Sequence, residues 1–440
     1  MNTFTRKAIL IITGLVFGVV LTIGGSVFAK RNDSRTIPLE DIRTLSEVFG
    51  KIKENYVEDI PDKTLLENAI RGMLTGLDPH STYLDASSYK ELRVGTSGEF
   101  GGLGIVVGME DGFVKVISPI DDTPADKAGI KAGDLIIRLD ETPVKGMGLD
   151  AAVKIMRGRP GTSIDLLIVR EGADKPMKIA VTRDKIRVKS VRNRSLDEGY
   201  GYVRISQFQE RTTKDLRKAI KKIKKENKGK LYGLVLDLRN NPGGLLDSAV
   251  SVSDTFLTKG NIVSVKGRGD SAKLKHQATP MDYTNGVPMV VLVNAGSASA
   301  SEIVAGALQD HKRAVIMGEK SFGKGSVQSV VPLGNNTAIK LTTARYYTPS
   351  GRSIQAEGIE PDIALDNLRI TENKDASAIE RVKEANLSKH LTNDTSKKKA
   401  KKKGTKQSKE ERISLAKQDY ALYEALNMLK GMRLLSNRKK

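Results

Sequence analysis

The sequence of 440 residues contains no cysteine. This absence excludes disulfide bonds, thiol nucleophiles and zinc sites built on cysteine thiolates. It does not indicate a redox compartment, because a cysteine-free chain is compatible with either side of a membrane. A nucleotide-binding loop is also missing, since Gly101-x-x-Gly104 is followed neither by a P-loop lysine nor by the complete glycine fingerprint of a dinucleotide fold.

Positive charge is in excess. The formal net charge is +21, from 73 lysines and arginines against 52 acids, which would suggest an anionic partner. Eight of the lysines lie between residues 397 and 409, within a low-complexity linker predicted over residues 371–412. The other basic residues are spread thinly without interleaved aromatics, so no nucleic-acid face is indicated. The linker is expected to be solvated, with contact to anionic lipid or cell-wall polymer as the alternative.

The amino terminus has the pattern of a targeting segment, predicted over residues 1–30. Arg6 and Lys7 precede an uncharged run of 22 residues, 8–29. That run is long enough to cross a bilayer, for which about 20 residues suffice. Residues 27–29, Val-Phe-Ala, also resemble a signal-peptidase site, so a cleaved signal peptide and a retained membrane anchor both remain open. In either case the protein is expected to be exported, to the periplasm or the extracytoplasmic face of an inner membrane.

Apolar residues recur at helical spacing through residues 35–95, a predicted N-terminal helical region. Helices are expected over residues 39–56 and 65–74. A turn follows at residues 78–81, Asp-Pro-His-Ser. We interpret His80 as a turn histidine bonded to the backbone, with a catalytic histidine as the alternative.

Strands and helices alternate over residues 185–370, which favours an α/β fold with a largely parallel sheet. Apolar strands are expected at residues 231–238 and 287–293, and each is followed by a turn. In such sheets functional groups gather at the carboxyl ends of the strands, so the two turns are expected to meet. Residues 264–285 are polar and rich in glycine and lysine, and they predict a mobile loop near this place.

Ser299 lies just after the second of these turns, at the start of a predicted helix. The free N–H groups and the dipole at this helix end favour a developing oxyanion, which makes Ser299 a candidate nucleophile. Residues 299–302, Ser-Ala-Ser-Glu, also form a capping box, which requires no catalytic role. Ser297 and Ser301 are rival candidates in the same segment.

A serine nucleophile needs a base, and Lys324 is the candidate. It lies in a glycine-rich loop with no acid closer along the chain than Glu319. Burial without a compensating acid lowers the pKa of a lysine from its free value of about 10.4. Gln328, four residues on, can hold the amine without adding charge. A solvated surface lysine is the alternative.

Three motifs carry a resemblance to the carboxyl-terminal processing proteases, the tail-specific serine peptidases of family S41. They are SASASE at residues 297–302, FGKGSVQ at residues 322–328 and the glycine-rich DLRNNPGG at residues 237–244. The resemblance covers roughly residues 35 to 370. It implies that the nucleophile, its base and the residue supporting the base are Ser299, Lys324 and Gln328. The oxyanion donors are expected to be the N–H groups of Gly243 and Ala300, with Gly244 as the alternative.

Residues 97–184 resemble a PDZ domain. The run GGLGIVV at residues 101–107 fits a loop that binds a C-terminal carboxylate and leads into a strand, to whose edge a peptide can add. A helix with Leu149 and Val153 is expected to flank the peptide, and Arg157 at its end is interpreted as a contact to peptide or protease body, or simply as a C-terminal helix cation. The predicted peptide-binding residues are Gly102, Leu103, Gly104, Ile105 and Val107.

An amphipathic helix is predicted over residues 413–435. It is expected to dock on the body of the protein or on a second subunit. The resemblance also implies a possible homodimer through the terminal helices.

The sequence therefore predicts a multidomain α/β protein, in which a signal or membrane helix, a helical arm and a PDZ domain precede an α/β serine-peptidase core and a C-terminal helix. The expected activity is serine endopeptidase hydrolysis of exported proteins with apolar C-terminal tails, by a Ser299–Lys324 dyad without metal or cofactor. One alternative is a Ser–His enzyme using His311, which lies in a polar segment suited to solvent. The other is an inactive PDZ scaffold that binds C-termini.

Overall fold

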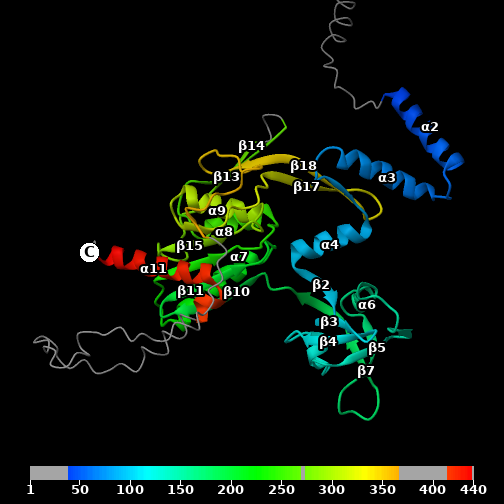
Figure 1. Cartoon of the computed structure of the whole chain (residues 1–440), viewed down its shortest axis with the longest axis horizontal. Helices are drawn as coiled ribbons and strands as arrows, with labels where there is room; N and C mark the ends of the chain where they lie inside the picture. Colours follow the sequence, from blue (N-terminus) through cyan, green and yellow to red (C-terminus); the bar gives the residue numbers. More distant parts are fainter. Residues whose placement is uncertain (1–37, 269–272, 366–413, 439–440) are drawn as a thin grey trace, which may run out of the picture. The chain divides into compact units, whose positions relative to one another are not determined.

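A computed structural model of the chain describes residues 38–268, 273–365 and 414–438 (Figure 1). The chain divides into two compact units, Met1–Gly76 and Leu77–Lys440, which we describe separately.

Two predicted segments, the targeting segment at residues 1–30 and the lysine-rich linker at residues 371–412, lie outside the described residues. Within the described ranges, none of the helices is long and apolar enough to cross a membrane.

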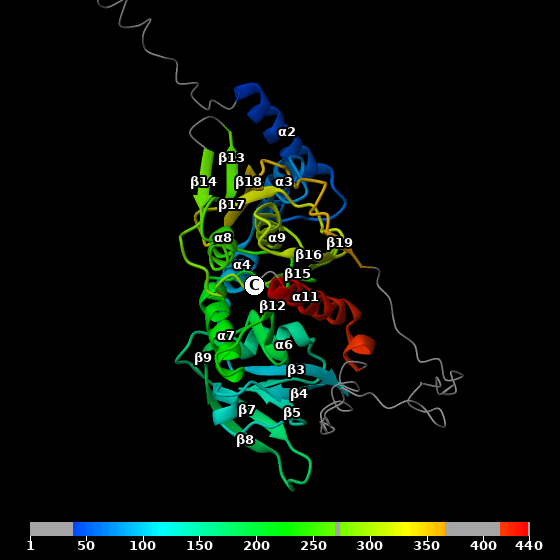
Figure 2. The same cartoon turned by 90° about the vertical axis from the view of Figure 1, so that its left-hand side faces the viewer.

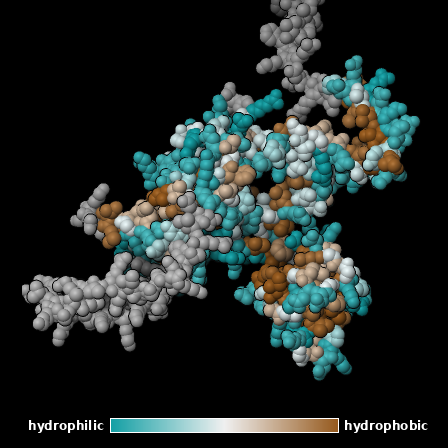
Figure 3. All heavy atoms as spheres, in the orientation of Figure 1, coloured by the Kyte–Doolittle hydropathy of each residue, from teal (hydrophilic) through white to brown (hydrophobic). Residues whose placement is uncertain are grey.

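The described part of the first unit, residues 38–76, contains two helices where the sequence predicts them, α2 (Leu39–Asn55) and α3 (Asp62–Thr75). An amphipathic helix is stabilised mainly by burying its apolar face. In α2, however, no residue is buried. Figure 3 shows hydrophobic side chains at the surface of this part of the chain, and on α2 these are Leu39, Ile42, Leu45, Val48 and Ile52.

The PDZ-like segment forms its own sheet around a separate apolar core, and a two-stranded ribbon of β2 (Glu99–Gly102) and β9 (Asp184–Arg187) joins its two ends. The sheet order is β3-β4-β5-β7-β8, with β6 paired to β5, so β3 is bonded on one side only among the described strands. The remaining elements are β3 (Ile105–Glu110), β4 (Phe113–Pro119), α5 (Pro124–Lys127), β5 (Leu135–Leu139), β6 (Thr142–Pro143), α6 (Leu149–Met156), β7 (Ser163–Val169) and β8 (Met177–Thr182).

A six-stranded sheet forms the centre of the protease-like segment and confirms the predicted α/β architecture. All neighbouring strands are parallel except the first pair, which is antiparallel. In sheet order the strands are β10 (Val191–Asp197), β11 (Tyr200–Ile205), β12 (Gly233–Asp237), β15 (Met289–Val293), β16 (Val315–Gly318) and β19 (Ile363–Ala364).

Both faces of this sheet are covered, which explains why its strands are apolar at consecutive positions. Leu234 and Leu236 pack on the side of α7 (Thr212–Glu226), α8 (Leu246–Asp254) and α9 (Ala300–Asp310). The alternate residue, Val235, packs on the opposite side, against the last helix, α11 (Tyr420–Arg438).

The C-terminal helix docks on the body of the protein, which was one of the two predicted placements. Figure 2 shows α11 beside β12 and β15, and its buried residues are Leu422, Ala425, Leu426 and Leu429. Residues 414–418 of the predicted helix are also helical, but the helix is interrupted at Asp419, which accepts a hydrogen bond from the Leu422 N–H at 3.0 Å and caps the start of α11. Asp419 also receives two hydrogen bonds from the Arg239 guanidinium, at 2.8 and 2.7 Å.

A second sheet contains four strands that the sequence did not predict. Residues 82–84, expected in a helical region, form β1 and pair with the end of β18. The loop predicted at residues 264–285 contains a hairpin of β13 and β14, and Gln328 lies on a strand, β17, rather than in a loop. The bounds are β1 (Thr82–Leu84), β13 (Asn261–Gly267), β14 (Lys273–Gln277), β17 (Ser326–Pro332) and β18 (Ala338–Tyr347), with α4 (Ala86–Ser97) following β1.

Candidate active site

Ser299 is the N-cap of α9 and has a backbone conformation that serine rarely adopts. Its φ is 56° and its ψ is −112°. A non-glycine residue in this region is strained by about 1–3 kcal/mol, and such strain is concentrated at functional sites, where the surrounding structure maintains it. The sharp turn after β15 therefore places Ser299 under constraint from its neighbours.

The two rival serines supply part of that constraint. The Ser297 hydroxyl donates to the Leu238 carbonyl oxygen at 2.9 Å and accepts from the Asn294 N–H at 3.0 Å. The Ser301 hydroxyl donates to the Asn241 carbonyl oxygen at 2.9 Å. Both side chains are fully buried, so they join the Ser299 turn to the loop after β12 and are not available as nucleophiles.

The glycine-rich loop after β12 lies directly against Ser299, as expected for two turns at the carboxyl ends of neighbouring strands. A Cβ atom placed on Gly243 would lie 2.9 Å from the Ser299 Cβ and 3.1 Å from the Ala300 nitrogen. The φ of Gly243 is 105°, which adds a conformational reason for glycine at this position.

The predicted oxyanion donors differ in what their N–H groups do. The Gly243 N–H donates to the Asn241 side-chain oxygen at 2.9 Å and is therefore already engaged. Among the hydrogen bonds of the described residues, the N–H groups of Gly244 and Ala300 have no protein acceptor. Both residues also line the cavity that contains Ser299. The geometry thus favours the pair of Gly244 and Ala300 over Gly243.

Lys324 is half-buried in the loop between β16 and β17. Burial lowers the pKa of its amine, and the nearby charge of Lys340 lowers it further. The sequence predicted no opposing acid, and this is corrected by the structure, because Asp78 and Glu302 act in the other direction on the pKa. The lowering by burial and Lys340 is the larger effect, so the net shift favours the neutral amine.

One buried carboxylate connects the serine and lysine segments. Glu302 accepts hydrogen bonds from the backbone N–H groups of Ser299 at 2.8 Å, Gly323 at 2.7 Å and Lys324 at 2.9 Å. It also accepts from the Ser321 hydroxyl at 2.6 Å. The sequence assigned Glu302 only to a capping box, and no local pattern indicated that its second oxygen would serve the lysine loop.

Ser299, Lys324 and Gln328 line one cavity of about 490 Å³. The Gln328 amide nitrogen donates to the hydroxyls of Ser326 at 2.9 Å and Thr342 at 3.3 Å, rather than holding the lysine amine. Other lining residues come from the glycine-rich loop, α4 and β18, and they include Gly244, Ala300, Leu92, Thr96 and Tyr346.

His80 lies in the predicted turn, where its backbone N–H donates to the Asp78 carboxylate at 2.8 Å, and the same carboxylate accepts from the Thr342 hydroxyl at 3.1 Å. The bond that the sequence predicts from the His80 ring to the backbone is not among the hydrogen bonds of the described residues. The sequence did not indicate how close this turn comes to the candidate base. Burial lowers the pKa of His80, and the positive charge of Lys324 contributes to that shift.

His311 lies at the opposite end of α9 from Ser299, about 18 Å away at 1.5 Å per residue. It is partly buried rather than solvated, and its Nε2 atom is 2.7 Å from the Asn261 carbonyl oxygen. The structure therefore does not bring His311 to Ser299.

We expect His311→Ala to keep kcat within about twofold of the native value, a change equivalent to a few tenths of a kcal/mol in the activation barrier. A peptidase assay together with a thermal melt checks this, and an inactive but fully folded variant would restore the Ser–His alternative.

The predicted peptide-binding residues of the PDZ-like unit differ in burial. Leu103 is only 2% exposed and belongs to the core. Ile105 and Val107, on the one-sided strand β3, are half-buried against that core, as are Leu149 and Val153 of α6.

The remaining predicted residues of this unit are placed by close contacts. Gly104 has a φ of 81°, and a Cβ atom there would lie 2.3 Å from the Thr123 Cβ. Gly102 is the last residue of β2. Arg157 caps the end of α6 and lies over the Phe100 ring at 4.8 Å from its centroid, so its described contact is with neither a peptide nor the protease-like core.

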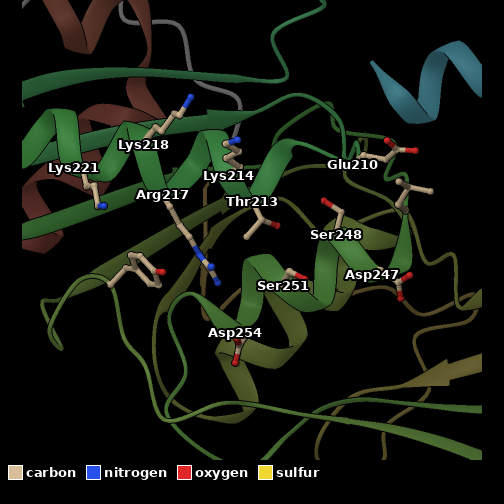
Figure 4. Close-up of a pocket in the computed structure, with 12 residues that line it drawn as sticks. Glu210, Thr213, Lys214, Arg217, Lys218, Lys221, Asp247, Ser248, Ser251 and Asp254 are labelled. Carbon is tan, nitrogen blue, oxygen red and sulfur yellow. The ribbon is translucent and has the colours of Figure 1, made fainter. Parts of the chain in front are cut away.

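A larger cavity of about 840 Å³ lies between α7 and α8 and contains none of the predicted site residues (Figure 4). Four cations of α7 line it, together with acids that include Asp247 and Asp254. Arg217 points toward α8 in Figure 4, and its guanidinium lies 4.4 Å from the Tyr283 ring centroid. The mixture of charges agrees with a solvated face.

In the part of the chain that the structure describes, no group of acids and histidines has the arrangement of a metal site.

Three parts of the chain match models of known protein families. Family models match peptidase family S41 at residues 199–365, the PDZ domain at residues 101–181 and the N-terminal domain of the activating protease CtpB at residues 25–88. The chain is 51% identical over 362 residues to the carboxy-terminal-processing protease of Bartonella bacilliformis, which covers 82% of this chain and 83% of that protein.

More distant relatives give the same result. The carboxy-terminal processing protease CtpA of Bacillus subtilis is 37% identical over 321 residues, with 72% of this chain and 68% of that protein covered. Among solved structures, the photosystem II D1 C-terminal processing protease is 32% identical, with a TM-score of 0.43 and coverage of 75% of this chain and 94% of that one. The identities to the two bacterial processing proteases argue against the inactive PDZ scaffold. The chain belongs to the carboxy-terminal-processing proteases of peptidase family S41, which are serine peptidases, and it carries a PDZ domain.

Proposed function

We propose that Ser299 is the nucleophile of this peptidase and that Lys324 is its general base. The observation that carries this proposal is the single buried carboxylate of Glu302, which fixes the backbone of both residues beside one cavity. The lowered pKa of the Lys324 amine provides the neutral base that the reaction needs.

In the proposed reaction, neutral Lys324 accepts the proton of the Ser299 hydroxyl as Oγ attacks the peptide carbonyl carbon. The carbonyl electrons move to an oxyanion, which accepts hydrogen bonds from the N–H groups of Gly244 and Ala300. Lys324 then protonates the leaving amine, and an acyl-enzyme remains on Ser299. A water molecule releases the acyl group, with Lys324 accepting its proton and returning a proton to Ser299.

Gln328 has a defined place in this scheme. Its amide nitrogen is fixed by Ser326 and Thr342, which leaves the side-chain oxygen to accept a hydrogen bond from Lys324 when the amine is protonated. Because the oxygen carries no charge, it supports the ammonium form without strongly raising its pKa.

We propose that the substrates are exported proteins with apolar C-terminal tails, which bind the PDZ domain. The open edge of β3 allows a peptide strand to add by main-chain hydrogen bonds. The half-buried side chains of β3 and α6 provide an apolar groove for the last residue of the tail.

The Val153→Lys variant tests this recognition. A lysine in the groove is expected to weaken binding of an apolar-tailed peptide about tenfold or more, because apolar contact is replaced by a charge that must be desolvated. Tail binding is measured by titration of a fluorescent peptide, and KM by cleavage of an unfolded reporter ending in the same tail. Asp150→Lys, on the exposed side of the same helix, is the matched control. Unchanged tail binding by Val153→Lys would contradict the proposed groove.

We also propose that residues 1–30 direct export of the protein. The uncharged run at residues 8–29 supports this proposal, because it is long enough to cross a bilayer. Cell fractionation of the full chain tests it.

We further propose that a second copy of the chain covers the exposed apolar face of α2. The exposed side chains of Leu45 and Val48 support this association. Sedimentation of the native chain beside a Leu45→Glu/Val48→Glu variant tests it.

A further inference from the structure

Tyr346 of β18 has a buried hydroxyl that no protein group satisfies. The residue is 2% exposed, and its hydroxyl has no hydrogen-bond partner among the described residues. The large majority of buried polar groups have a partner, and an unsatisfied one is costly. The residue lines the same cavity as Ser299 and Lys324, so its hydroxyl belongs to the space where substrate is converted.

The backbone of Tyr346 is fixed beside the lysine loop. The Tyr346 N–H donates to the Gly325 carbonyl oxygen at 3.0 Å, one residue beyond Lys324. On the other side, β18 pairs with β13, where Tyr346 is opposite Val265. The side chain is buried as far as its hydroxyl, so this group does not face solvent.

Ser299 is the neighbour with which the hydroxyl interacts. The Ser299 hydroxyl is close enough to act on the pKa of Tyr346 as a hydrogen-bonding neighbour, in the lowering direction, although the two hydroxyls do not have the geometry of a hydrogen bond in this state. Burial and the negative charge of Glu302 raise the pKa of Tyr346 well above its ordinary value. The phenol therefore keeps its proton at any working pH and acts only as a donor toward a developing negative charge.

We propose that the Tyr346 hydroxyl is a catalytic donor that forms a hydrogen bond to Ser299 Oγ as that oxygen loses its proton. This inference rests on the proposed function, in which Ser299 is the nucleophile. The proton of Ser299 moves to the lone pair of Lys324 Nζ, the new bond forms between Oγ and the carbonyl carbon, and Tyr346 keeps its own proton throughout. The donor stabilises the charge on Oγ during this transfer and again when Oγ leaves the acyl group.

The effect is expected in kcat rather than in KM. A hydrogen bond that is absent in the resting state and forms as charge develops stabilises the transition state more than the ground state. A hydrogen bond to a charged oxygen corresponds to a rate effect of about 10- to 100-fold. Tail binding by the PDZ domain does not involve Tyr346 and should not change.

Tyr346→Phe is the decisive variant, because it removes the hydroxyl and keeps the ring. We expect kcat for a tailed, unfolded reporter to fall about 10- to 100-fold, with KM and tail binding unchanged. Since the hydroxyl has no partner, its loss should not lower Tm, and removal of a buried unsatisfied group should raise Tm by about 2–4 °C per kcal/mol gained. Tyr347→Phe is the matched control, since it removes a hydroxyl from the adjacent residue, whose described ring contact is with Lys266.

Loss of rate without loss of stability is the result that a merely structural tyrosine would not give. Native kcat in Tyr346→Phe would overturn the proposal, and so would a fall in kcat accompanied by a matching fall in Tm. Ser299→Ala, assayed in parallel, distinguishes failure of the proposed function from failure of the role proposed for Tyr346. An active Ser299→Ala variant would refute the proposed function itself. An inactive one beside a native-rate Tyr346→Phe would refute only the role of Tyr346.

Discussion

Replacing Ser299 or Lys324 by alanine is expected to lower kcat for an apolar-tailed reporter by at least about 10⁴-fold, as for catalytic groups that act as a unit. Ser299→Ala removes the oxygen that forms the acyl-enzyme, and Lys324→Ala removes the group that accepts its proton. Lys324→Arg should be equally inactive, because a guanidinium stays protonated at every working pH. The measurement is single-turnover cleavage, with tail binding and Tm recorded for each variant.

The double variant with both Ser299→Ala and Lys324→Ala should have a kcat little lower than that of either single variant. Groups that serve one step are strongly non-additive when removed together. All three variants should bind the tail with native affinity, because the proposed tail-binding residues lie in the PDZ domain and include neither Ser299 nor Lys324. Cleavage by Lys324→Ala at the native rate would refute the dyad and require His80 and His311 to be reconsidered.

The pH dependence of the native enzyme gives an independent test of the same base. Only the neutral amine of Lys324 accepts a proton, so kcat/KM should rise with pH and level off above its pKa, which lies below the ordinary value of 10.5. Two variants should move this rise in opposite directions. Lys340→Met removes a charge that lowers the pKa, so the rise should move to higher pH. Asp78→Asn removes a charge that raises the pKa, so the rise should move to lower pH.

Glu302→Ala is expected to have the largest effect on stability, with a loss of about 4 kcal/mol or more in the free energy of unfolding. The variant leaves four donors without their acceptor, and each unsatisfied buried donor costs about 1–3 kcal/mol. The four donors are the N–H groups of Ser299, Gly323 and Lys324 and the hydroxyl of Ser321. Chemical denaturation of the native and variant proteins measures the loss.

Activity should fall with Glu302→Ala even where the variant remains folded. The strained conformation of Ser299 persists only while its surroundings hold it, and Glu302 binds its N–H directly. The activity and stability of Glu302→Gln should be intermediate. The glutamine keeps one oxygen that accepts hydrogen bonds, but its NH₂ group is a donor and faces N–H groups that are donors themselves. The control is Glu319→Ala, an exposed acid close in sequence, which should change stability by less than about 0.5 kcal/mol. Equal stability of Glu302→Ala and the control would contradict the role assigned to this carboxylate.

The chemistry of this site could be anticipated largely because its groups lie in short, contiguous motifs. The nucleophile is next to a helix start, and the base is in a glycine-rich loop, so each could be recognised locally. The parallel sheet was also predictable, because β15 is apolar at every position and β12 is apolar up to Asp237, its last residue, as expected for strands buried on both faces. The three-residue strand β1 was missed because it is too short to show an alternating pattern.

Partners of individual atoms could not be predicted in the same way. Ser297, Ser299 and Ser301 are equivalent in the local sequence, and only the contacts of the first and third with the β12 loop distinguish them from the nucleophile. Gly243 and Gly244 are likewise equivalent until the Asn241 side chain engages one of their two N–H groups.

The sequence by itself therefore determined the family, the helices and strands of the core, and the segments that carry the candidate nucleophile and base, since all of these depend on residues close together along the chain. Only the tertiary structure decided the double use of Glu302, the proximity of Lys340 and Asp78 to Lys324, and the unsatisfied hydroxyl of Tyr346. Each of these features depends on how segments distant in sequence come together in the fold. Its strength depends on distances of about 3 Å, which no local pattern of residues specifies.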